Sequence, residues 1–254
     1  MHRWKTSPKS RREGAPLTFE VIPVHVGSRR ADSSLFYYLT EPHQQLTIHY
    51  RLWVVKGRDA TIVVDSGLPP DEALRRGITD AKDVEVALRE AGVEVDSVRM
   101  VVLTHLHWDH ASNAQRFSRA TFVAQRAELD WLTSPFLREK TIGRFYSDVE
   151  VFQKMAGAGR FRLLDGDETI VPGIEALKVG GHTPGSQMLV VDGRNGQSVI
   201  AGDAIPMNRN YVERIPTGLH LNLLQAIDAL KRTERIAPHT LFTGHDPEAA
   251  LTIS

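Results

Sequence analysis

The stretch THLHWDH, residues 104–110, places three histidines and one aspartate within six consecutive positions. It follows VRMVVL, a nearly continuous apolar run that predicts a buried strand. Because His105 and His107 are two residues apart at the exit of that strand, their side chains can point the same way. Asp109 and His110 follow where the chain turns into a predicted helix over DHASNAQRF, so they can face another direction. Since histidine is the commonest metal ligand in proteins, the pattern predicts one loop that serves two adjacent metal ions.

Two ligands cannot complete a tetrahedral metal site, so each ion needs partners from elsewhere in the chain. Three further candidates each stand at the end of a predicted strand: His182 in GGHTPGS, Asp203 in AGDA and His245 in TGHDP. Glycines flank all three, and glycine lets the backbone turn tightly and approach a metal closely. A lone histidine at such a place is more often an ordinary residue, but the combined pattern favours a metal site.

Composition excludes several classes of site and partner. The chain has no cysteine, which rules out disulfides, thiolate metal sites and cysteine nucleophiles. Lys plus Arg equals Asp plus Glu, 31 against 31, which argues against a nucleic-acid partner. No segment approaches eighteen uninterrupted apolar residues, so we expect no membrane span, no secretory signal and a cytoplasmic protein. We expect residues 1–15 to form a flexible tail and residues 16–254 to form a single domain.

The remaining sequence alternates strand and helix patterns. Strands rich in β-branched residues are predicted at 19–26, 46–57, 60–67, 122–125, 174–182 and 239–247. A strand region with a turn at Asp165 to Asp167 is predicted at 161–171, and two strands joined by a glycine-rich turn are predicted at 188–203. Helical patterns are predicted at 80–91, 126–132, 135–158 and 221–232. This order predicts sheets flanked by helices, with ligands at the strand ends.

Four of these motifs occur in a characteristic order: THLHWDH, GGHTPGS, AGDA and TGHDP, with Asp65 in VVDSG upstream. On these motifs the sequence resembles the metallo-β-lactamase fold superfamily from about residue 17 onward. The resemblance implies an α+β fold, a four-layer αβ/βα sandwich with metals at one edge of its two sheets. It also implies that the first metal is held by His105, His107 and His182, the second by Asp109, His110 and His245, and that Asp203 bridges the two.

Within the superfamily, the details favour the N-acyl-homoserine lactonase group. True β-lactamases lack the bridging aspartate, and flavodiiron-type members have a glutamate where this chain has His107. Glyoxalase II-like thioester hydrolases usually end in a basic helical region, whereas this chain stops nine residues after His245. The lactonase-like group matches the strand-rich N-terminal region, the HWDHASNAQRF continuation, and IPTGLH followed by GHDP. Such lactonases are sometimes dimers, so a homodimer is possible.

One position departs from that group. Many of these lactonases have a tyrosine three residues after the bridging aspartate, where it contacts the lactone carbonyl, and this chain has Pro206. Polarisation of the carbonyl must then fall to a metal, to Tyr211 or to His220. Asp65 is a candidate for fixing a metal-binding imidazole, although a strand-end aspartate is as often a turn former. Two roles are open for the aromatic residues between 136 and 155 and for Met155 and Met207. These side chains either pack in the core or line a pocket for an acyl chain.

These observations predict a lactone hydrolase with two divalent metal ions, zinc first and iron, cobalt or manganese as alternatives. Its substrate would be a small lactone or ester, acyl-homoserine lactones first. A metal can lower the pKa of its water to about 7, so a bridging hydroxide would attack the carbonyl. Asp109 would orient it and pass a proton to the leaving alkoxide. The alternatives are another lactone (pyridoxine-derived or a sugar lactone), a thioester, a phosphodiesterase or nuclease, and a metal-binding protein without turnover.

Overall fold

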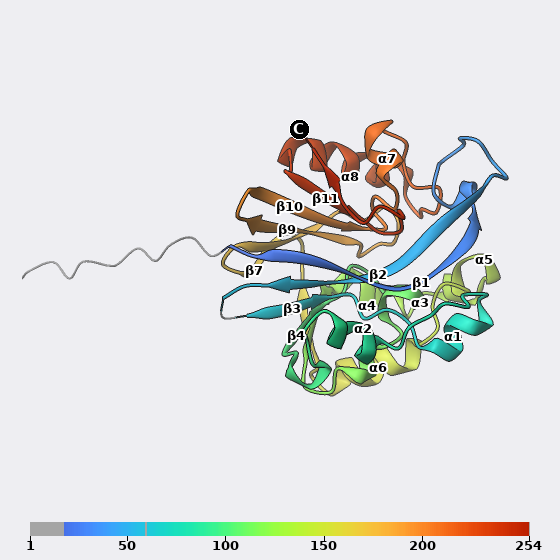
Figure 1. Cartoon of the computed structure of the whole chain (residues 1–254). Coiled ribbons are helices and arrows are strands. Elements are labelled where there is room, and N and C mark those ends of the chain that lie inside the picture. Colours follow the sequence, from blue (N-terminus) through green and yellow to red (C-terminus); the bar gives the residue numbers. More distant parts are fainter. Residues whose placement is uncertain (1–17, 59, 254) are drawn as a thin grey trace, which may run out of the picture.

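The computed structural model describes residues 18–58 and 60–253, so the tail expected over residues 1–15 lies outside the described residues. In the described part, two six-stranded mixed sheets pack face to face, and helices cover the outer face of each (Figure 1). The layers follow one another as α, β, β, α. The predicted α+β sandwich is therefore confirmed.

The first sheet has the strand order β1-β2-β3-β4-β5-β6. Its strands are β1 (Glu20–Asp32), β2 (Gln45–Lys56), β3 (Thr61–Val64), β4 (Met100–Val102), β5 (Thr121–Gln125) and β6 (Phe161–Leu164). The second sheet has the order β12-β11-β10-β9-β8-β7. Its strands are β7 (Glu168–Val171), β8 (Ile174–Lys178), β9 (Gln187–Gly193), β10 (Gly196–Gly202), β11 (Thr240–Thr243) and β12 (Leu251–Thr252).

Helices on the first sheet lie between β3 and β6 in the sequence: α1 (Pro70–Arg75), α2 (Val84–Glu90), α3 (Trp108–Ala111), α4 (Arg126–Trp131), α5 (Lys140–Gly143) and α6 (Val149–Gly157). The second sheet is covered by α7 (Asn208–Val212) and α8 (Leu223–Ile236). Four single turns of 3-10 helix connect other elements: η1 (Ser33–Leu35), η2 (Val95–Ser97), η3 (Ala114–Arg116) and η4 (Pro135–Arg138). Among the described residues, no helix combines the length and apolar content that a membrane crossing needs.

Three apolar clusters hold the layers together. The cluster between the sheets joins Trp53 and Val102 of the first sheet to Leu189 and Ile200 of the second, and all four side chains are fully buried. A larger cluster joins the outer face of the first sheet to its helices, and a smaller one packs α8 on the second sheet. Alternation along each strand sends successive side chains to the two faces, so both faces of each sheet bury apolar residues.

The helix predicted over DHASNAQRF is shorter than expected. α3 ends at Ala111, and the chain re-forms only a 3-10 turn, η3, from Ala114. The loop after β3 takes the backbone groups that would continue the helix: Ser66 N–H donates to the carbonyl of His110, and Asn113 N–H donates to the carbonyl of Gly67. These tertiary bonds replace helical ones and fix the metal-binding loop against β3.

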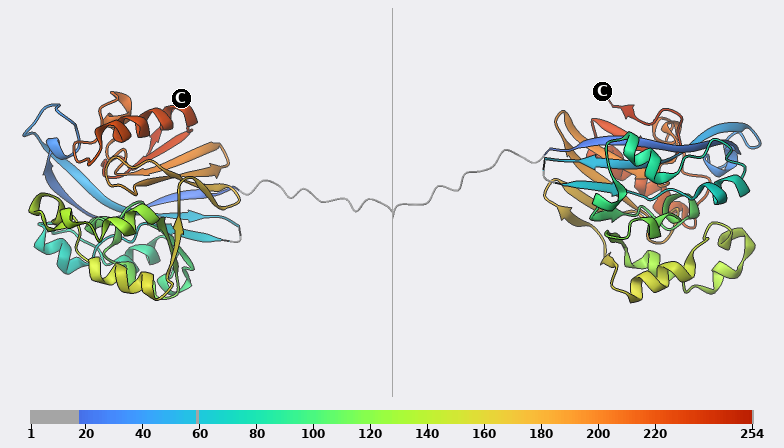
Figure 2. Two further views of the ribbon diagram at one scale, coloured as in Figure 1. Left: turned by 180° about the vertical axis from the view of Figure 1, so that it is seen from behind. Right: turned by 60° about the horizontal axis from the view of Figure 1, so that its bottom comes forward.

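β1 and β2 form a long ribbon whose connection reaches the other side of the sandwich. Figure 2 shows this ribbon extending beyond the first sheet toward the segment that carries α7. The contact is specific: Leu219 N–H donates to the carbonyl of Leu35, and Asn210 Nδ2 donates to the carbonyl of Phe36. Arg209 adds an ion pair with Glu41 at 2.8 Å. The ribbon therefore bridges the two sheets near the strand ends that carry the candidate ligands.

Candidate metal centre

The seven predicted metal ligands meet where strand ends of both sheets come together. The first sheet supplies four of them, from the loop after β4 and from α3: His105, His107, Asp109 and His110. The second sheet supplies three, which follow β8, β10 and β11 respectively: His182, Asp203 and His245. The structure thus brings together side chains that lie up to 140 positions apart in the sequence.

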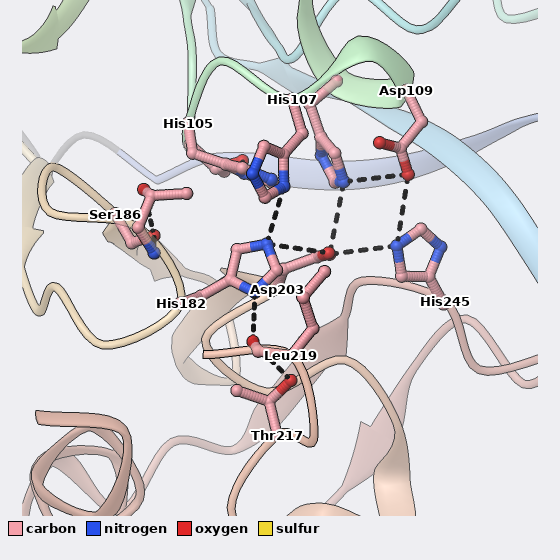
Figure 3. Close-up of polar contacts among 12 residues, drawn as sticks. His105, His107, Asp109, His182, Ser186, Asp203, Thr217, Leu219 and His245 are labelled. Carbon is pink, nitrogen blue, oxygen red and sulfur yellow. Dashed lines mark hydrogen bonds and ion pairs between the residues drawn. The ribbon is translucent and has the colours of Figure 1, made fainter. Parts of the chain in front are cut away.

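Three overlapping triads offer ligand atoms within 4.8 Å of one another: His105, His107 and His182; His105, His110 and Asp203; and Asp109, His110 and His245. Asp203 Oδ1 lies 3.2 Å from His110 Nε2 and 3.0 Å from His245 Nε2, and Asp203 Oδ2 lies 3.4 Å from His182 Nε2. In Figure 3 the Asp203 carboxylate stands among these rings. It lies between His110 of the first sheet and His182 and His245 of the second.

Backbone carbonyls orient two of the rings. His182 Nδ1 lies 2.6 Å from the carbonyl oxygen of Leu219, and His245 Nδ1 lies 2.9 Å from that of His49. A carbonyl only accepts, so each Nδ1 carries the hydrogen and each Nε2 is left to face the cluster. This arrangement, in which a second partner fixes the tautomer, is typical of metal-binding histidines.

Asp65 orients the His110 ring and the backbone of the loop after β4. Its Oδ2 lies 2.7 Å from His110 Nδ1, and its Oδ1 accepts from the backbone N–H of Thr104 at 2.7 Å. The Thr104 hydroxyl, which donates to Asp65, also lies 3.1 Å from His105 Nδ1. Asp65 is completely buried and has a left-handed backbone, with φ of 63°. The structure thus favours the ring-fixing interpretation of Asp65 over that of a simple turn former.

Glycines allow two strand ends to approach the cluster. A Cβ on Gly244 would stand 2.6 Å from Asp203 Oδ1, and a Cβ on Gly202 would stand 3.0 Å from Thr104. Gly202 also has a positive φ of 50°, which side chains other than glycine rarely adopt. The expectation that flanking glycines serve close approach is met at both positions.

Glu128 is a supporting residue that sequence reasoning missed. It lies in α4, is completely buried, and accepts hydrogen bonds from Leu106 N–H, Gly185 N–H and the Thr183 hydroxyl. It thereby ties the loop of His105 and His107 to the loop of His182. A glutamate in the first turn of a short helix is ordinarily exposed, so only the tertiary contact reveals this role.

The histidines divide into two electrostatic groups. Burial, followed by neighbouring histidines, holds the pKa values of His105 and His107 well below the usual value, and burial also lowers the pKa of His182. These three rings are therefore neutral near pH 7, the form that binds metal. Burial also acts to lower the pKa values of His110 and His245, but nearby carboxylates outweigh it and raise both.

The two cluster aspartates remain ionised. Burial acts to raise the pKa of Asp109, but His110 and His245 lower it to about 2. Burial opposes ionisation of Asp203 as well, and the same two histidines hold its pKa well below the usual value. Two buried negative charges at this site favour a cation between them.

The donor set fits divalent metal ions. Three buried atoms, His105 Nε2, His110 Nε2 and Asp203 Oδ1, have no hydrogen-bond partner within the described residues. Buried polar atoms without a partner are rare in proteins, and these three point into the same small volume. Imidazole nitrogen and carboxylate oxygen together suit zinc and other first-row divalent metals.

A cavity opens onto the cluster. Five of the candidate ligands line it: His107, Asp109, His182, Asp203 and His245. Apolar side chains form most of the remaining wall: Leu35, Phe36, Ile48, Trp108, Phe145, Pro206 and Leu219. The polar wall residues are Arg29, Tyr50 and Thr217. Pro206 thus lies at the cavity, as the resemblance to the lactonase group implied, and it offers no hydroxyl there.

Tyr211 and His220, the two candidates for replacing the absent tyrosine, do not line this cavity. Tyr211 packs against the cluster under α8 and borders a surface hollow with Arg214 and Leu251. His220 Nδ1 lies 2.8 Å from the carbonyl of Thr217, and its ring pairs edge-on with Tyr38. Their catalytic role remains a prediction that these placements do not support.

The aromatic residues between 136 and 155 divide between the two predicted uses. Phe152 and Met155 of α6 are buried in the core on the first sheet, as is Met207. Phe145 lines the metal cavity. Phe136 instead lines a second cavity with Trp131, beside the loop that carries His182.

Comparisons with known proteins agree with this geometry. A family model described as the metallo-beta-lactamase superfamily matches residues 52–245. An N-acyl homoserine lactonase of a Bacillus species is 24% identical over 226 residues, which cover 82% of this chain and 85% of that protein. A probable metallo-hydrolase of Methanocaldococcus jannaschii is 27% identical over 172 residues, covering 66% of this chain and 68% of that protein.

Solved structures show the same fold at low identity. One is AiiA of B. thuringiensis, a variant with N-decanoyl-L-homoserine at its active site, with a TM-score of 0.75, 21% identity, and coverage of 92% of this chain and 95% of that chain. Another is AidC, a dizinc quorum-quenching lactonase, with a TM-score of 0.74, 14% identity, and coverage of 94% and 92%. With a family model that spans most of its length and a buried histidine–aspartate cluster that fits divalent ions, the chain belongs to the metallo-beta-lactamase superfamily and is a metallo-hydrolase.

Proposed function

We propose that the protein opens lactone rings by hydrolysis at a site of two divalent metal ions, zinc first. The observation that carries this proposal is the set of three overlapping triads with the Asp203 carboxylate between them. When bound, two such ions would provide a hydroxide nucleophile at neutral pH and would polarise a carbonyl oxygen. His105, His107 and His182 would hold one ion, and Asp109, His110 and His245 the other, with Asp203 shared.

Asp109 has the position and charge for the proton transfer. Its Oδ2 lies 3.5 Å from His110 Nε2 and 3.5 Å from His245 Nε2, and the side chain also lines the cavity. The carboxylate is ionised at neutral pH, so it can accept a proton from water and return it to the alkoxide that leaves the opened ring. Trp108 and Phe145 line the cavity beside it.

Acyl-homoserine lactones are the first substrates to test, because the Bacillus relative is named for them. A second cavity of about 490 Å³, lined by Trp131, Phe136 and Ile142, adjoins the His182 loop through Gly181 and Thr183. Its apolar wall could accept an acyl chain. Thioesters and other lactones, such as pyridoxine-derived or sugar lactones, are the alternatives within the same chemistry.

The test is hydrolysis of acyl-homoserine lactones of several chain lengths by metal-loaded protein, followed as proton release, with a chelated sample as control. We expect metal-dependent turnover at a kcat/KM of about 10⁴ M⁻¹s⁻¹ or more, the low end for ordinary enzymes. Asp109→Asn should lower kcat by about 100-fold or more, the usual contribution of general acid–base catalysis. Turnover that survives chelation, or an Asp109→Asn protein with full activity, would contradict the proposal.

A further inference from the structure

Arg29 and Tyr50 place two hydrogen-bond donors in the wall of the metal cavity. The Tyr50 hydroxyl is buried, and neither it nor the buried Arg29 Nε has a hydrogen-bond partner within the described residues. Arg29 Nη1 makes one long bond, 3.3 Å, to the carbonyl of Arg76. Unmet donors of this kind cost free energy unless a ligand satisfies them.

The ribbon of β1 and β2 puts the two side chains on one face. Arg29 pairs with Ile48 across the ribbon, and Gly27 pairs with Tyr50, two residues further along β2. Arg29 and Tyr50 are thus diagonal neighbours, a spacing that long side chains span. The guanidinium carbon of Arg29 lies 5.9 Å from the centre of the Tyr50 ring.

Tyr50 connects this pair to the candidate metal ligands. Its ring centre lies 5.4 Å from that of His245 and 5.5 Å from that of Trp108. A phenol keeps its proton at neutral pH, so the Tyr50 hydroxyl can act as a hydrogen-bond donor. A substrate group bound by Arg29 would therefore lie beside Tyr50, whose ring contacts the candidate metal ligand His245.

The charges around Arg29 indicate what it binds. No ion pair joins Arg29 to a carboxylate anywhere in residues 18–58 and 60–253, whereas the neighbouring Arg76 pairs with Glu72 at 2.6 Å. The acidic residues of the cavity wall are Asp109 and Asp203, which we assign to the metals. Carboxylates held by metal ions would not be available to neutralise Arg29. The guanidinium fork also matches a carboxylate in shape, with two parallel hydrogen bonds.

We propose that Arg29 and Tyr50 bind a carboxylate of the substrate, and that the preferred substrate is a lactone that carries a free acid group. This inference rests on the proposed function for the reaction, which is lactone hydrolysis. It adds that the preferred lactones carry a free acid group. It predicts that neutral lactones, acyl-homoserine lactones included, are poorer substrates than an acidic lactone of similar size. Arg29 and Tyr50 are thus specificity-determining residues, distinct from the metal ligands and from Asp109.

The first experiment measures binding without catalysis. Tetrahydrofuran-2-carboxylate and its carboxamide contain no ester, so neither can be hydrolysed. Calorimetry on the metal-loaded protein should show about tenfold tighter binding of the carboxylate, the factor that a hydrogen bond to a charged group typically contributes. Arg29→Gln should abolish this difference. Equal binding of both compounds by the unaltered protein would show that the cavity has no site for the acid group. The same preference in Arg29→Gln would show that the carboxylate binds the metals rather than Arg29, and either result would overturn the inference.

Arg30 offers a matched control. It is the next residue on β1, but it is exposed and donates to the carbonyl of Gln45 and to Thr47 Oγ1. Arg30→Gln removes the same charge from the other face of the ribbon and should keep the carboxylate preference. Arg29→Lys keeps the charge without the fork and should retain part of the preference, which covers the case that Arg29→Gln fails to fold. Loss of the preference in Arg30→Gln would show a general charge effect and contradict the assignment.

The second experiment separates this inference from the proposed reaction. It compares kcat and KM for 5-oxotetrahydrofuran-2-carboxylate, an acidic lactone, with those for its carboxamide. We expect Arg29→Gln to raise KM for the acid by about tenfold, because a lost ground-state contact acts on KM, whereas Arg30→Gln should leave kcat and KM for both lactones within about twofold. If neither lactone is hydrolysed but the binding preference depends on Arg29, the acid site stands and the proposed reaction fails. If both lactones are hydrolysed equally well, the reaction stands and the acid site fails.

Discussion

Asp65 shows how one buried carboxylate can set the geometry of a metal site that it does not enter. It contacts the Nδ1 of His110 and both the backbone and the hydroxyl of Thr104, so the ring and the loop are fixed together. Its left-handed backbone is stabilised by these contacts, since side chains other than glycine rarely adopt that conformation unaided.

Replacing Asp65 by asparagine tests this role at nearly constant volume. The amide is a weaker acceptor and does not hold His110 as a carboxylate does, so we expect metal affinity to fall by about 10–100-fold, the usual cost of losing such a partner. Competition with a chromophoric chelator measures the affinity. Asp96→Asn, at an exposed aspartate, is the control and should bind as the unaltered protein does. Unchanged metal affinity in Asp65→Asn would show that Asp65 does not orient His110 for metal binding.

The opposite pKa shifts of the histidines predict that metal binding releases protons mainly at one half of the site. His105 and His107 are neutral near pH 7, whereas carboxylates raise the pKa values of His110 and His245 so that these rings hold protons in the metal-free protein. A metal must displace those protons, so its affinity should rise with pH until the raised pKa values are passed.

Calorimetry in buffers with different ionisation enthalpies counts these protons. We expect at least one proton to be released near pH 7 when the site is filled, and fewer as the pH rises. Asp109→Asn removes one of the carboxylates that raise the two pKa values and should reduce the number released. Binding that releases no protons at pH 7 would contradict the electrostatic description of His110 and His245.

At the scale of elements, the strands and the ligand loops could be predicted from the sequence because their signals are local. The runs MVV and VIAG are apolar, and ligand-bearing loops follow both of them. The extent of α3 could not be predicted, because backbone groups of Ser66 and Gly67 end it through bonds across 44 to 46 positions. Glu128, Arg29 and Tyr50 were missed for the same reason, since their functions arise from contacts distant in sequence.

α8 ends at an alanine whose backbone has the left-handed conformation that glycine adopts more easily. Ala237 is the C-cap and has the left-handed backbone, with φ of 49° and ψ of 58°. Glycine adopts this conformation without the steric cost that other residues bear, so Ala237→Gly should stabilise the protein by about 1 kcal/mol. Urea unfolding followed by circular dichroism measures the change.

Lys231→Gly is the matched control, because it places the same residue at an exposed position inside α8. There glycine should destabilise the protein by about 0.5–1 kcal/mol, because it loses more conformational entropy on folding than other residues do. A loss of stability in Ala237→Gly as large as that in Lys231→Gly would contradict the cap geometry.

At the scale of the whole molecule, the ligands connect the two sheets. Four come from the first sheet and three from the second, so bound metal ions would link the halves of the sandwich across the edge that the inter-sheet core leaves open. Any ligand that binds the folded state alone stabilises it by mass action, by about 2.7 kcal/mol when its concentration is 100 times the Kd.

Metal removal should therefore lower the melting temperature by several degrees, and added zinc should restore it. Thermal unfolding with chelator and then with excess zinc measures the effect. Asp203→Ala removes the shared ligand, so its melting temperature should depend much less on zinc. A melting temperature that is the same with and without metal would show that the ions do not link the sheets.

We propose that two metal ions per chain act together on a lactone. Stepwise addition of zinc to the metal-free protein, with bound metal and lactone hydrolysis measured on the same samples, tests this proposal. We expect hydrolysis to be slight at one equivalent of zinc, to rise with the second, and to stop rising at two ions per chain. Full activity at one equivalent, or two bound ions without hydrolysis of any neutral or acidic lactone, would contradict it.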